Sequence, residues 1–330
     1  NGKETFEKQK LLLRKSKYNM KKRVLVVSSA NMDFVMKVQK LPEAGQTIVE
    51  SRSYNSVPGG KGANAAVSLA RLGGDCIFCC RLGSDTHAKR LKELYVDNHI
   101  DVRFIKHDRL HPTGLASIIV EENGDNRIIV YPGANRELSS DDIEDAFTCL
   151  PDAVFIQFEI PDSAVIVATQ FAKRRNIPVF IDAGPARPDY PLDKLSRLEV
   201  ISPNETECFA LTGVLPNNSE NCLRAASILM QKVDTKYVVI KLGGRGAYIH
   251  DGKYSQLVPT YEGEVVDTTA AGDAFSAALT LEYLKSGDIL HSVKYANVVG
   301  TMVVGKAGAS TSLPTEAEVD EFIRSRRIVL

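Results

Sequence analysis

The sequence contains no tryptophan, no net charge and no long apolar run. Lys and Arg number 41 and Asp and Glu number 41, and this balance argues against a dedicated nucleic-acid binder, which is usually basic. No apolar run approaches the ~20 residues that cross a bilayer, and the first residues lack the apolar stretch of a signal peptide. We therefore expect a cytoplasmic protein that binds neither nucleic acid nor membranes.

Cysteine is also scarce, with six residues in 330. Three of them lie in the apolar run 76–80, which is typical of a buried strand, and no second Cys/His pair follows at the spacing of a zinc site. We expect reduced thiols and no structural zinc.

The chain divides into a short basic segment and one long domain. Residues 1–22 carry many Lys and Arg side chains against only Glu4 and Glu7, with Met20 as a candidate natural start. We interpret 1–22 as a disordered arm. We expect a single domain over 23–330, which is long enough to bury a full core.

Within that domain, short apolar runs alternate with helical patterns. This alternation predicts an α/β fold: a doubly wound, mostly parallel sheet with helices on both faces. A last helix begins near Thr315, where Glu318 completes a capping box. The predicted strands are 24–27, 153–156, 179–181, 199–201 and 237–241, and the predicted helices are 63–72, 162–176, 219–233, 271–285 and 290–304.

Two stretches, 46–54 and 113–131, alternate apolar with polar residues instead. The second has Asn123-Gly124 between two apolar runs, which is a strong hairpin signal. We predict a small antiparallel sheet that forms a lid, with its strands within about 34–57 and 112–131. Because such strands leave open edges, we expect a homodimer that pairs through the lid.

Two polar segments near the start are candidates for sugar binding. Asn31 and Asp33 follow the first strand and place an amide and a carboxylate where they could bind vicinal hydroxyls, although a plain turn explains them too. The glycine-rich stretch 58–66 leads into a helix and includes Lys61 and Asn64. It is not a Walker P-loop, because Gly62 follows Lys61. A binding loop and a flexible turn both remain possible there.

The segment 267–275 is the strongest candidate for chemistry. Ala270, Ala271 and Gly272 put backbone N–H groups at a helix N-terminus with almost no side chain in the way, which makes an anion hole. Asp273 follows directly. A carboxylate beside an anion hole is what phosphoryl transfer to a hydroxyl requires. Simple capping by Asp273 is the alternative, but it needs no Ala-Ala-Gly.

Two further segments are weaker candidates. Asn204, Glu205 and Glu207 follow a strand and could hold magnesium-bound phosphates, although acids in the first turn of a helix are common. The stretch 241–247 is a strand followed by a glycine turn, which could cradle a nucleotide or be an ordinary hairpin.

Taken together, these segments resemble the ribokinase-like sugar kinase family from about Arg23 to Ile323. The most specific pieces are 59–64, which is similar to the form that the family's ribose kinases carry, and 267–273. The resemblance implies ATP-dependent phosphorylation of ribose at its 5-hydroxyl, with Asp273 as general base and 270–272 as the anion hole. The residues that it implies around the sugar are Asn31, Asp33, Gly60, Lys61, Gly62, Ala63, Asn64, Glu159 and Asp273.

The resemblance also implies ATP, magnesium and a monovalent cation, usually potassium. The expected nucleotide residues are Asn204, Glu207, Lys241, Leu242, Gly243, Gly244, Arg245, Gly246, Gly272 and Asn297. The expected potassium ligands are Asp267, Thr269, Val303, Lys306, Gly308 and Ser312.

One departure weakens the choice of ribose: Asp182 stands where many ribose kinases carry Asn. Deoxyribose, another sugar or a nucleoside therefore remain alternative acceptors. A non-catalytic sugar or nucleotide sensor is a further alternative, against which the intact 270–273 segment argues. A dinucleotide-dependent oxidoreductase is weaker still, because no glycine fingerprint follows the first strand.

Overall fold

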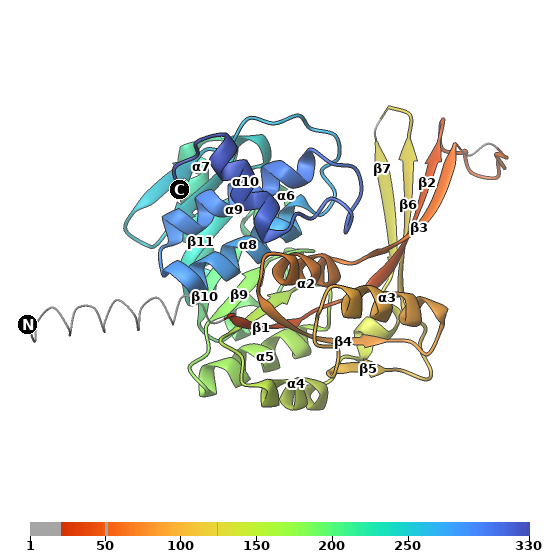
Figure 1. Ribbon diagram of the computed structural model, residues 1–330, viewed down its shortest axis with the longest axis horizontal. Helices are drawn as coiled ribbons and strands as arrows, with labels where there is room; N and C mark the ends of the chain where they lie inside the picture. The colour runs from red at the N-terminus through yellow and green to blue at the C-terminus, as the bar shows by residue number, and fades with distance from the viewer. Residues whose placement is uncertain (1–20, 50–51, 124) are drawn as a thin grey trace, which may run out of the picture.

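Along strand β1 (Arg23–Val27), alternate side chains enter two different hydrophobic cores. Val24 and Val26 belong to one core, and Leu25 and Val27 belong to the other. Successive side chains of a strand point to opposite faces, so an unbroken apolar run requires cover on both sides. The computed structural model, which describes residues 21–49, 52–123 and 125–330, has that arrangement, with helices above and below the sheet (Figure 1).

The main sheet has nine strands in the order β13-β12-β11-β10-β9-β8-β1-β4-β5. Its pairings are parallel except those of β12 with β11 and β13 at one edge. The doubly wound, mostly parallel sheet is therefore confirmed. Besides β1, its strands are β4 (Asp75–Leu82), β5 (Ile105–His107), β8 (Ala153–Gln157), β9 (Val179–Asp182), β10 (Leu198–Ser202), β11 (Thr235–Lys241), β12 (Ala247–His250) and β13 (Ser255–Val258).

Two groups of helices cover the sheet. The first group packs with Val24 and Val26, and the second packs with Leu25 and Val27. The first group is α2 (Lys61–Arg71), α3 (Thr86–Asp97), α8 (Ala271–Ser286), α9 (Ile289–Val304) and α10 (Glu316–Ser325). The second is α4 (Ser140–Ala146), α5 (Asp162–Arg174), α6 (Glu205–Thr212) and α7 (Ser219–Lys232). Short 3-10 helices are η1 (Gly133–Glu137), η2 (Phe147–Cys149), η3 (Leu192–Lys194) and η4 (Gly243–Arg245).

The predicted helices are all present, with ends that differ by one or two residues. The capping box of Thr315 and Glu318 at the start of α10 is confirmed. The helix predicted over 63–72 begins earlier, at Lys61, so that Lys61 and Asn64 lie in its first turns.

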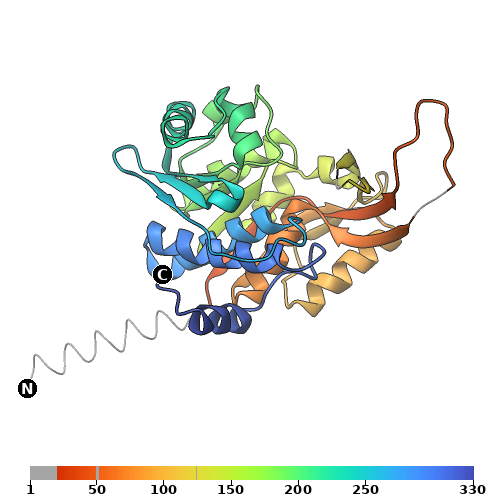
Figure 2. The ribbon, with the colours of Figure 1, turned by 90° about the horizontal axis from the view of Figure 1, so that it is seen from above.

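A separate four-stranded sheet projects from the body and forms the lid (Figures 1 and 2). Its order is β3-β2-β6-β7, with antiparallel outer pairs and a parallel pairing of β2 with β6 in the middle. The small sheet and its hairpin are confirmed, while Gly124 of the predicted turn lies outside the described residues. The lid strands are β2 (Asn31–Val38), β3 (Ser53–Gly59), β6 (Gly114–Glu121) and β7 (Asn126–Tyr131).

Two predictions for this region need correction. The strand expected over 46–54 is wrong for 46–49, which have no regular structure, and 50–51 lie outside the described residues; β3 instead runs on to Gly59. Asn31 and Asp33 lie in strand β2 and not in a turn. The arm predicted over 1–22 lies outside the described residues except for 21–22.

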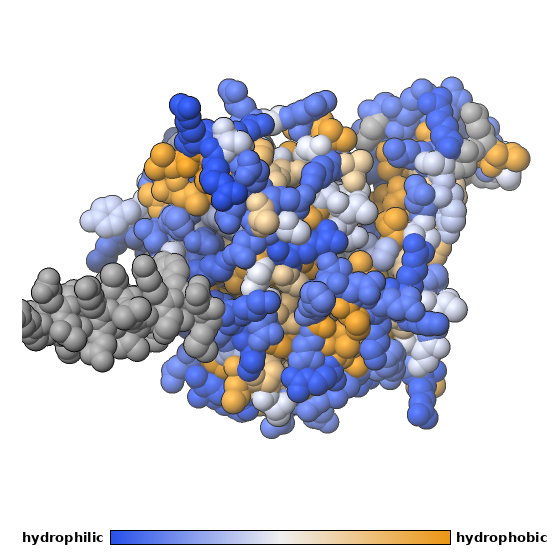
Figure 3. Space-filling view, viewed as in Figure 1, coloured by the Kyte–Doolittle hydropathy of each residue, from blue (hydrophilic) through white to orange (hydrophobic). Residues whose placement is uncertain are grey.

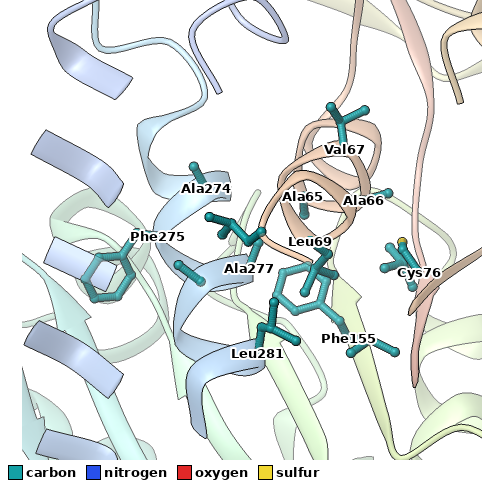
Figure 4. Packing of buried hydrophobic residues seen from close by; sticks show 14 of the residues in the cluster. Ala65, Ala66, Val67, Leu69, Cys76, Phe155, Ala274, Phe275, Ala277 and Leu281 are labelled. Carbon is teal, nitrogen blue, oxygen red and sulfur yellow. The ribbon is translucent and has the colours of Figure 1, made fainter. Parts of the chain in front are cut away.

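Helix α2 packs directly against α8, and small residues make that contact close (Figure 4). Ala65, Ala66, Ala274 and Ala277 lie in this core and are fully buried. Short side chains let the two helix backbones approach each other, so the first turns of both helices end near the same point. The position of one helix therefore limits the position of the other.

Among the described residues, no helix is both long and apolar enough to cross a membrane. All six cysteines are buried free thiols.

The α2–α8 contact predicts a stability defect for Ala277→Leu. The larger side chain overpacks a fully buried site, so we expect the free energy of unfolding to fall by about 1–3 kcal/mol. Urea denaturation measures the change. Arg224→Leu, at an exposed position of α7, is the matched control and should change stability little. An Ala277→Leu variant as stable as the wild type would contradict the close helix contact.

Candidate active site

Polar side chains gather at the carboxyl ends of the central parallel strands. Gln157 ends β8, Asp182 ends β9, Ser202 ends β10 and Lys241 ends β11. All four are buried. The carboxyl ends of the strands in an open α/β sheet are where ligands bind, and buried polar groups cost free energy unless they are paired or used. This edge is therefore the candidate site.

Asp273 is held above this edge by the first turn of α8. Its carboxylate accepts a hydrogen bond from Asn64 Nδ2 at 2.9 Å and one from Gln157 Nε2 at 3.4 Å. Burial raises the pKa of Asp273 to about 6, and Asp182 adds to that effect, while Lys61 and the bond from Asn64 work against it. A carboxylate with a pKa just below neutrality is well matched to proton abstraction at physiological pH.

The start of α8 exposes backbone N–H groups beside Asp273. Ala270 adopts the left-handed conformation, with φ of 62°, and provides no side-chain cap. Ala271 N–H donates to Thr268 O at 3.3 Å, which leaves the first-turn N–H groups of Gly272 and Asp273 without a helical acceptor. A non-glycine residue at positive φ is strained by about 1–3 kcal/mol and is common at functional sites. The expected anion hole thus has the geometry of an uncapped helix N-terminus.

On the lid side, Asn31, Asp33 and Glu159 lie close together. Asn31 Nδ2 donates to Glu159 Oε2 at 3.3 Å, and Ser29 Oγ donates to the same oxygen. Burial raises the pKa of Asp33 to about 7, with help from the charges of Glu159 and Asp273. The carboxylates of Asp33, Glu159 and Asp273 keep further capacity to accept hydrogen bonds, which suits a ligand with several hydroxyl groups.

The first turn of α2 faces these acids. Asp273 raises the pKa of Lys61, and the charges of Asp182, Glu207 and Glu159 act in the same direction, so its ammonium stays charged. Gly60 has φ of 91°, and a Cβ there would lie 2.8 Å from the Asn31 nitrogen, so the loop requires glycine. Gly62 and Ala63 are buried, and a Cβ on Gly62 would collide with Ser28 at 2.3 Å. These two residues pack the turn against β1.

A cavity of about 800 Å³ lies on the other side of the anion hole. This volume is within the usual range for small-molecule sites. Several of the residues that line this cavity were expected from the sequence to bind the nucleotide, namely Asn204, Lys241, Gly243, Gly244, Gly246, Gly272 and Asn297. Others were not expected, such as Thr260, Tyr261, Val265 and Gly300.

Five of the expected nucleotide residues make structural contacts within the protein. Leu242 is buried in the second core. Arg245 is outside the cavity lining and bonds Glu205 and the carbonyl of Pro216. The amide of Asn297 donates to the carbonyls of Val258 and Pro259, each at 3.1 Å, so it fastens the cavity wall. Asn204 caps α6, and Glu207 completes the capping box by accepting from Asn204 N–H at 2.8 Å. The helix-capping interpretation of this segment is therefore observed.

Five of the six expected potassium ligands lie in two neighbouring loops, and the sixth, Val303, lies in helix α9. Asp267 bridges these loops, because its carboxylate accepts from Thr269 N–H and from Gly308 N–H, both at 2.9 Å. Although partial burial works in the opposite direction, these hydrogen bonds lower the pKa of Asp267. Ser312 is buried and donates to Ala309 O at 2.8 Å. Val303 lies in the last turn of helix α9, and its carbonyl accepts from Lys306 N–H.

Two residues of the site were missed from the sequence. Gln157 Nε2 donates to both Asp182 and Asp273, and its Oε1 accepts from Ser28 Oγ. Asn135 Nδ2 donates to Asn31 Oδ1 at 2.7 Å and orients that side chain. The position of Gln157, a single amide at the end of an apolar run, could have indicated a site residue. Asn135 lies in the short helix η1, where the sequence shows no apolar periodicity that would indicate a role.

Comparison with known proteins agrees with this geometry. Residues 21–316 match the pfkB family of carbohydrate kinases. The ribokinase of Haemophilus influenzae is 33% identical over 307 residues, which cover 92% of this chain and 99% of that protein. A bifunctional ribokinase/ribose-5-phosphate isomerase A of Fructilactobacillus sanfranciscensis is 33% identical over 301 residues, and the chain spans 55% of its length. The structure of Arabidopsis thaliana ribokinase complexed with ribose and ATP superimposes with a TM-score of 0.83 at 30% identity, over 92% of this chain and 99% of that one.

Fold and site thus define an ATP-dependent sugar kinase. The chain belongs to the pfkB family of carbohydrate kinases.

The burial of Asp33 predicts a pH-dependent stability difference for Asp33→Asn. Folding raises this pKa from 3.8 to about 7, so the contribution of Asp33 to stability is full below pH 4 and is lost as the pH rises through 7. The neutral amide avoids that loss. We expect Asp33→Asn to be more stable than the wild type at pH 8, by on the order of 1–3 kcal/mol, and the gap to shrink at pH 5.

Urea denaturation at both pH values measures this difference. Asp193→Asn, at an exposed position, is the control and should show no such trend. A stability difference that is the same at pH 5 and pH 8 would show that Asp33 is ionised freely in the folded protein.

Proposed function

We propose that the protein phosphorylates D-ribose at its 5-hydroxyl with ATP. The observation that carries this proposal is Asp273, which is buried between the lid-side acids and the uncapped start of α8, beside a nucleotide-sized cavity. The similarity to ribokinases over 99% of a relative's length supports ribose as the acceptor.

In this mechanism Asp273 acts as general base. Its carboxylate takes the proton of the 5-hydroxyl while the bond from that oxygen to the γ-phosphorus forms and the bond to the β,γ-bridging oxygen breaks, so ADP leaves. The free N–H groups at the start of α8 stabilise the negative charge on the transferring group. Asn64 holds the carboxylate in place through its 2.9 Å bond.

The sugar hydroxyls would be bound on the lid side. Asn31 and Asp33 would form hydrogen bonds with the 2- and 3-hydroxyls. The remaining contacts with the sugar would come from Gly60, Lys61, Asn64 and Glu159. Because buried groups left without a partner cost free energy, this arrangement predicts weaker binding of deoxyribose. Closure of the lid over the sugar would keep water from acting as the acceptor.

The nucleotide would occupy the cavity beside Gly243, Gly244, Gly246 and Asn297. Magnesium fits this site as a partner of the phosphates: Asn204 lines the cavity, and Glu207 lies next to it as its partner in the capping box of α6. No cluster of three or more acidic, histidine or cysteine side chains capable of holding a metal exists among the described residues. Bound magnesium would supply positive charge to the phosphates, mainly through their own oxygens and water.

The proposed potassium site has a suitable set of ligands. One carboxylate, the Ser312 hydroxyl and the carbonyls of Thr269, Val303, Lys306 and Gly308 are all oxygen donors, as a hard monovalent cation requires. A bound cation would supply charge that fixes the loop before α8. Asp267 already ties that loop to Gly308, so the loop's position depends on this point in the ligand-free protein too.

The exposed lid supports a homodimer as a further part of the proposal. Strand β7 is the edge of the lid sheet, and all its described side chains are exposed, including Ile128 and Ile129. Apolar side chains are visible on this part of the surface (Figure 3). Pairing with a second lid would cover that edge. We also propose a cytoplasmic location, which the buried free thiols fit.

The decisive test measures coupled ADP release with ATP and magnesium for ribose, deoxyribose, fructose and adenosine, with and without potassium. We expect ribose-selective turnover that potassium raises.

Asp273→Asn should lower kcat by about 10²–10⁴ without loss of ribose binding. In the wild type, kcat should fall about tenfold per pH unit below pH 6, where Asp273 becomes protonated.

Turnover with another acceptor would move the specificity but keep the mechanism. An Asp273→Asn variant with near-full activity would refute the assigned base. Absence of turnover with every acceptor, from folded protein, would favour a sensor.

The lid interface makes a separate prediction. Light scattering should give the wild type about twice the 36.2 kDa mass of the chain, and Ile129→Lys should give the single-chain mass, because a charge at the covered edge opposes pairing. Leu223→Lys, at an exposed site on α7, is the control and should stay dimeric. A monomeric wild type, or a dimeric Ile129→Lys variant, would contradict the interface.

A further inference from the structure

Lys241 carries a buried ammonium that is only partly used by the protein. Its side chain ends β11 and is 9% exposed. Its Nζ donates to Asp182 Oδ1 at 2.5 Å and to Ser276 Oγ at 3.3 Å. An ammonium has three N–H donors, and the described contacts use two of them, so one donor remains.

That ammonium lies at the anion hole. Lys241 lines the cavity together with Ala271 and Gly272, and a Cβ on Gly272 would be 3.6 Å from Nζ. Lys61 lies in the first turn of α2, and Asn64 of the same turn donates to Asp273. The start of α8 therefore has Lys241 beside it in the cavity lining and the first turn of α2 next to Asp273.

Lys241 places a second positive charge beside the positive N-terminus of α8, and Asp182 compensates it. A helix N-terminus is itself positive, so an ammonium beside it is stable only with a compensating anion, and Asp182 supplies that charge. A buried ion pair brings a desolvation cost that simple packing would avoid. The ion pair also joins two strands that are not neighbours, because β10 lies between β9, which carries Asp182, and β11, which carries Lys241. Ser202 of β10, in register with Asp182, has a buried hydroxyl without a hydrogen-bond partner.

Asp182 is also connected to the candidate base. Gln157 Nε2 donates to Asp182 Oδ2 at 3.3 Å and to Asp273 Oδ1 at 3.4 Å. One amide group therefore joins the carboxylate that holds Lys241 to the carboxylate that would take the sugar proton.

We propose that Lys241 is a catalytic residue that binds the transferring γ-phosphoryl group, with Asp182 as the positioning residue that holds its ammonium at the anion hole. This inference rests on the proposed kinase function. As the bond from the sugar oxygen to phosphorus forms and the bond to the bridging oxygen of ADP breaks, negative charge spreads over the phosphoryl oxygens. The free N–H of Lys241 binds that charge beside the N–H groups of Gly272 and Asp273. The proton goes to Asp273, and Lys241 acts only as a hydrogen-bond donor.

The test compares Lys241→Met with Lys236→Met. Both lysines lie on β11, but Lys236 is at the opposite end of the strand, where it pairs with Glu199. For Lys241→Met we expect kcat to fall about 10²–10³-fold, as for the loss of one donor to a transition state, with the KM for ribose unchanged. Calorimetry should show that β,γ-methylene-ATP loses affinity while ADP, which has no γ-phosphate, binds as before. Lys236→Met should keep kcat and both nucleotide affinities.

A purely structural pair gives a different pattern. Lys241→Met would then lower thermal stability and leave kcat and the preference for β,γ-methylene-ATP over ADP intact, which would overturn the proposal. Asp182→Asn keeps the shape but removes the negative charge. For it we expect a reduced kcat and a shift of the pH–rate profile, because Asp182 raises the pKa of Asp273. An unchanged profile would overturn the positioning role.

The nucleotide measurements need no sugar, so the two proposals fail separately. If the wild type does not turn over ribose but Lys241→Met loses the γ-phosphate preference, the acceptor is wrong and the role of Lys241 stands. If the wild type turns over ribose and Lys241→Met matches it, the role of Lys241 is wrong and the kinase proposal stands.

Discussion

The hydrogen bond from Asn64 to Asp273 joins the start of α2 to the start of α8, and the packing of these helices over the sheet holds the two residues together. Asn64 comes from the start of α2 and Asp273 from the start of α8, so the bond needs the N-termini of two helices to meet over one sheet edge. The alanines between the helices allow that approach. The same closeness buries Asp273, and burial raises its pKa towards the value that a base needs at neutral pH.

Negative charges crowd one side of the candidate site. Asp33, Glu159 and Asp273 are its acids, and burial raises the pKa of Asp33 to about 7 with help from the charges of the other two. Hydroxyl groups of a sugar can donate to such acids, so binding would relieve this crowding of charge. Function and stability therefore oppose each other at Asp33, as is common at binding sites.

The lid is continuous with the site. Strand β2 follows β1 after three residues, 28–30, and its first residue, Asn31, pairs with Gly59 and Gly114. A Cβ on Gly114 would lie 2.2 Å from Asn31 Oδ1, so the absence of a side chain there leaves room for the binding amide. The residues proposed to contact the sugar thus lie where the lid joins the body, and movement of the lid would move them.

The sequence by itself determined the layered fold and the chemistry of its most distinctive segment. Apolar runs such as 24–27 have only one stable arrangement, a strand covered on both faces, and the segment 270–273 contains its own helix start, free N–H groups and carboxylate. Such properties are local, so they can be read from neighbouring residues. Only the tertiary structure decided the rest. Gln157, Asp182 and Lys241 come from three strands, and their pairing depends on strand order and on side-chain burial. Asn31 and Asp33 belong to a strand because β3 and β6 pair with them, and no residue beside them in the chain specifies those partners.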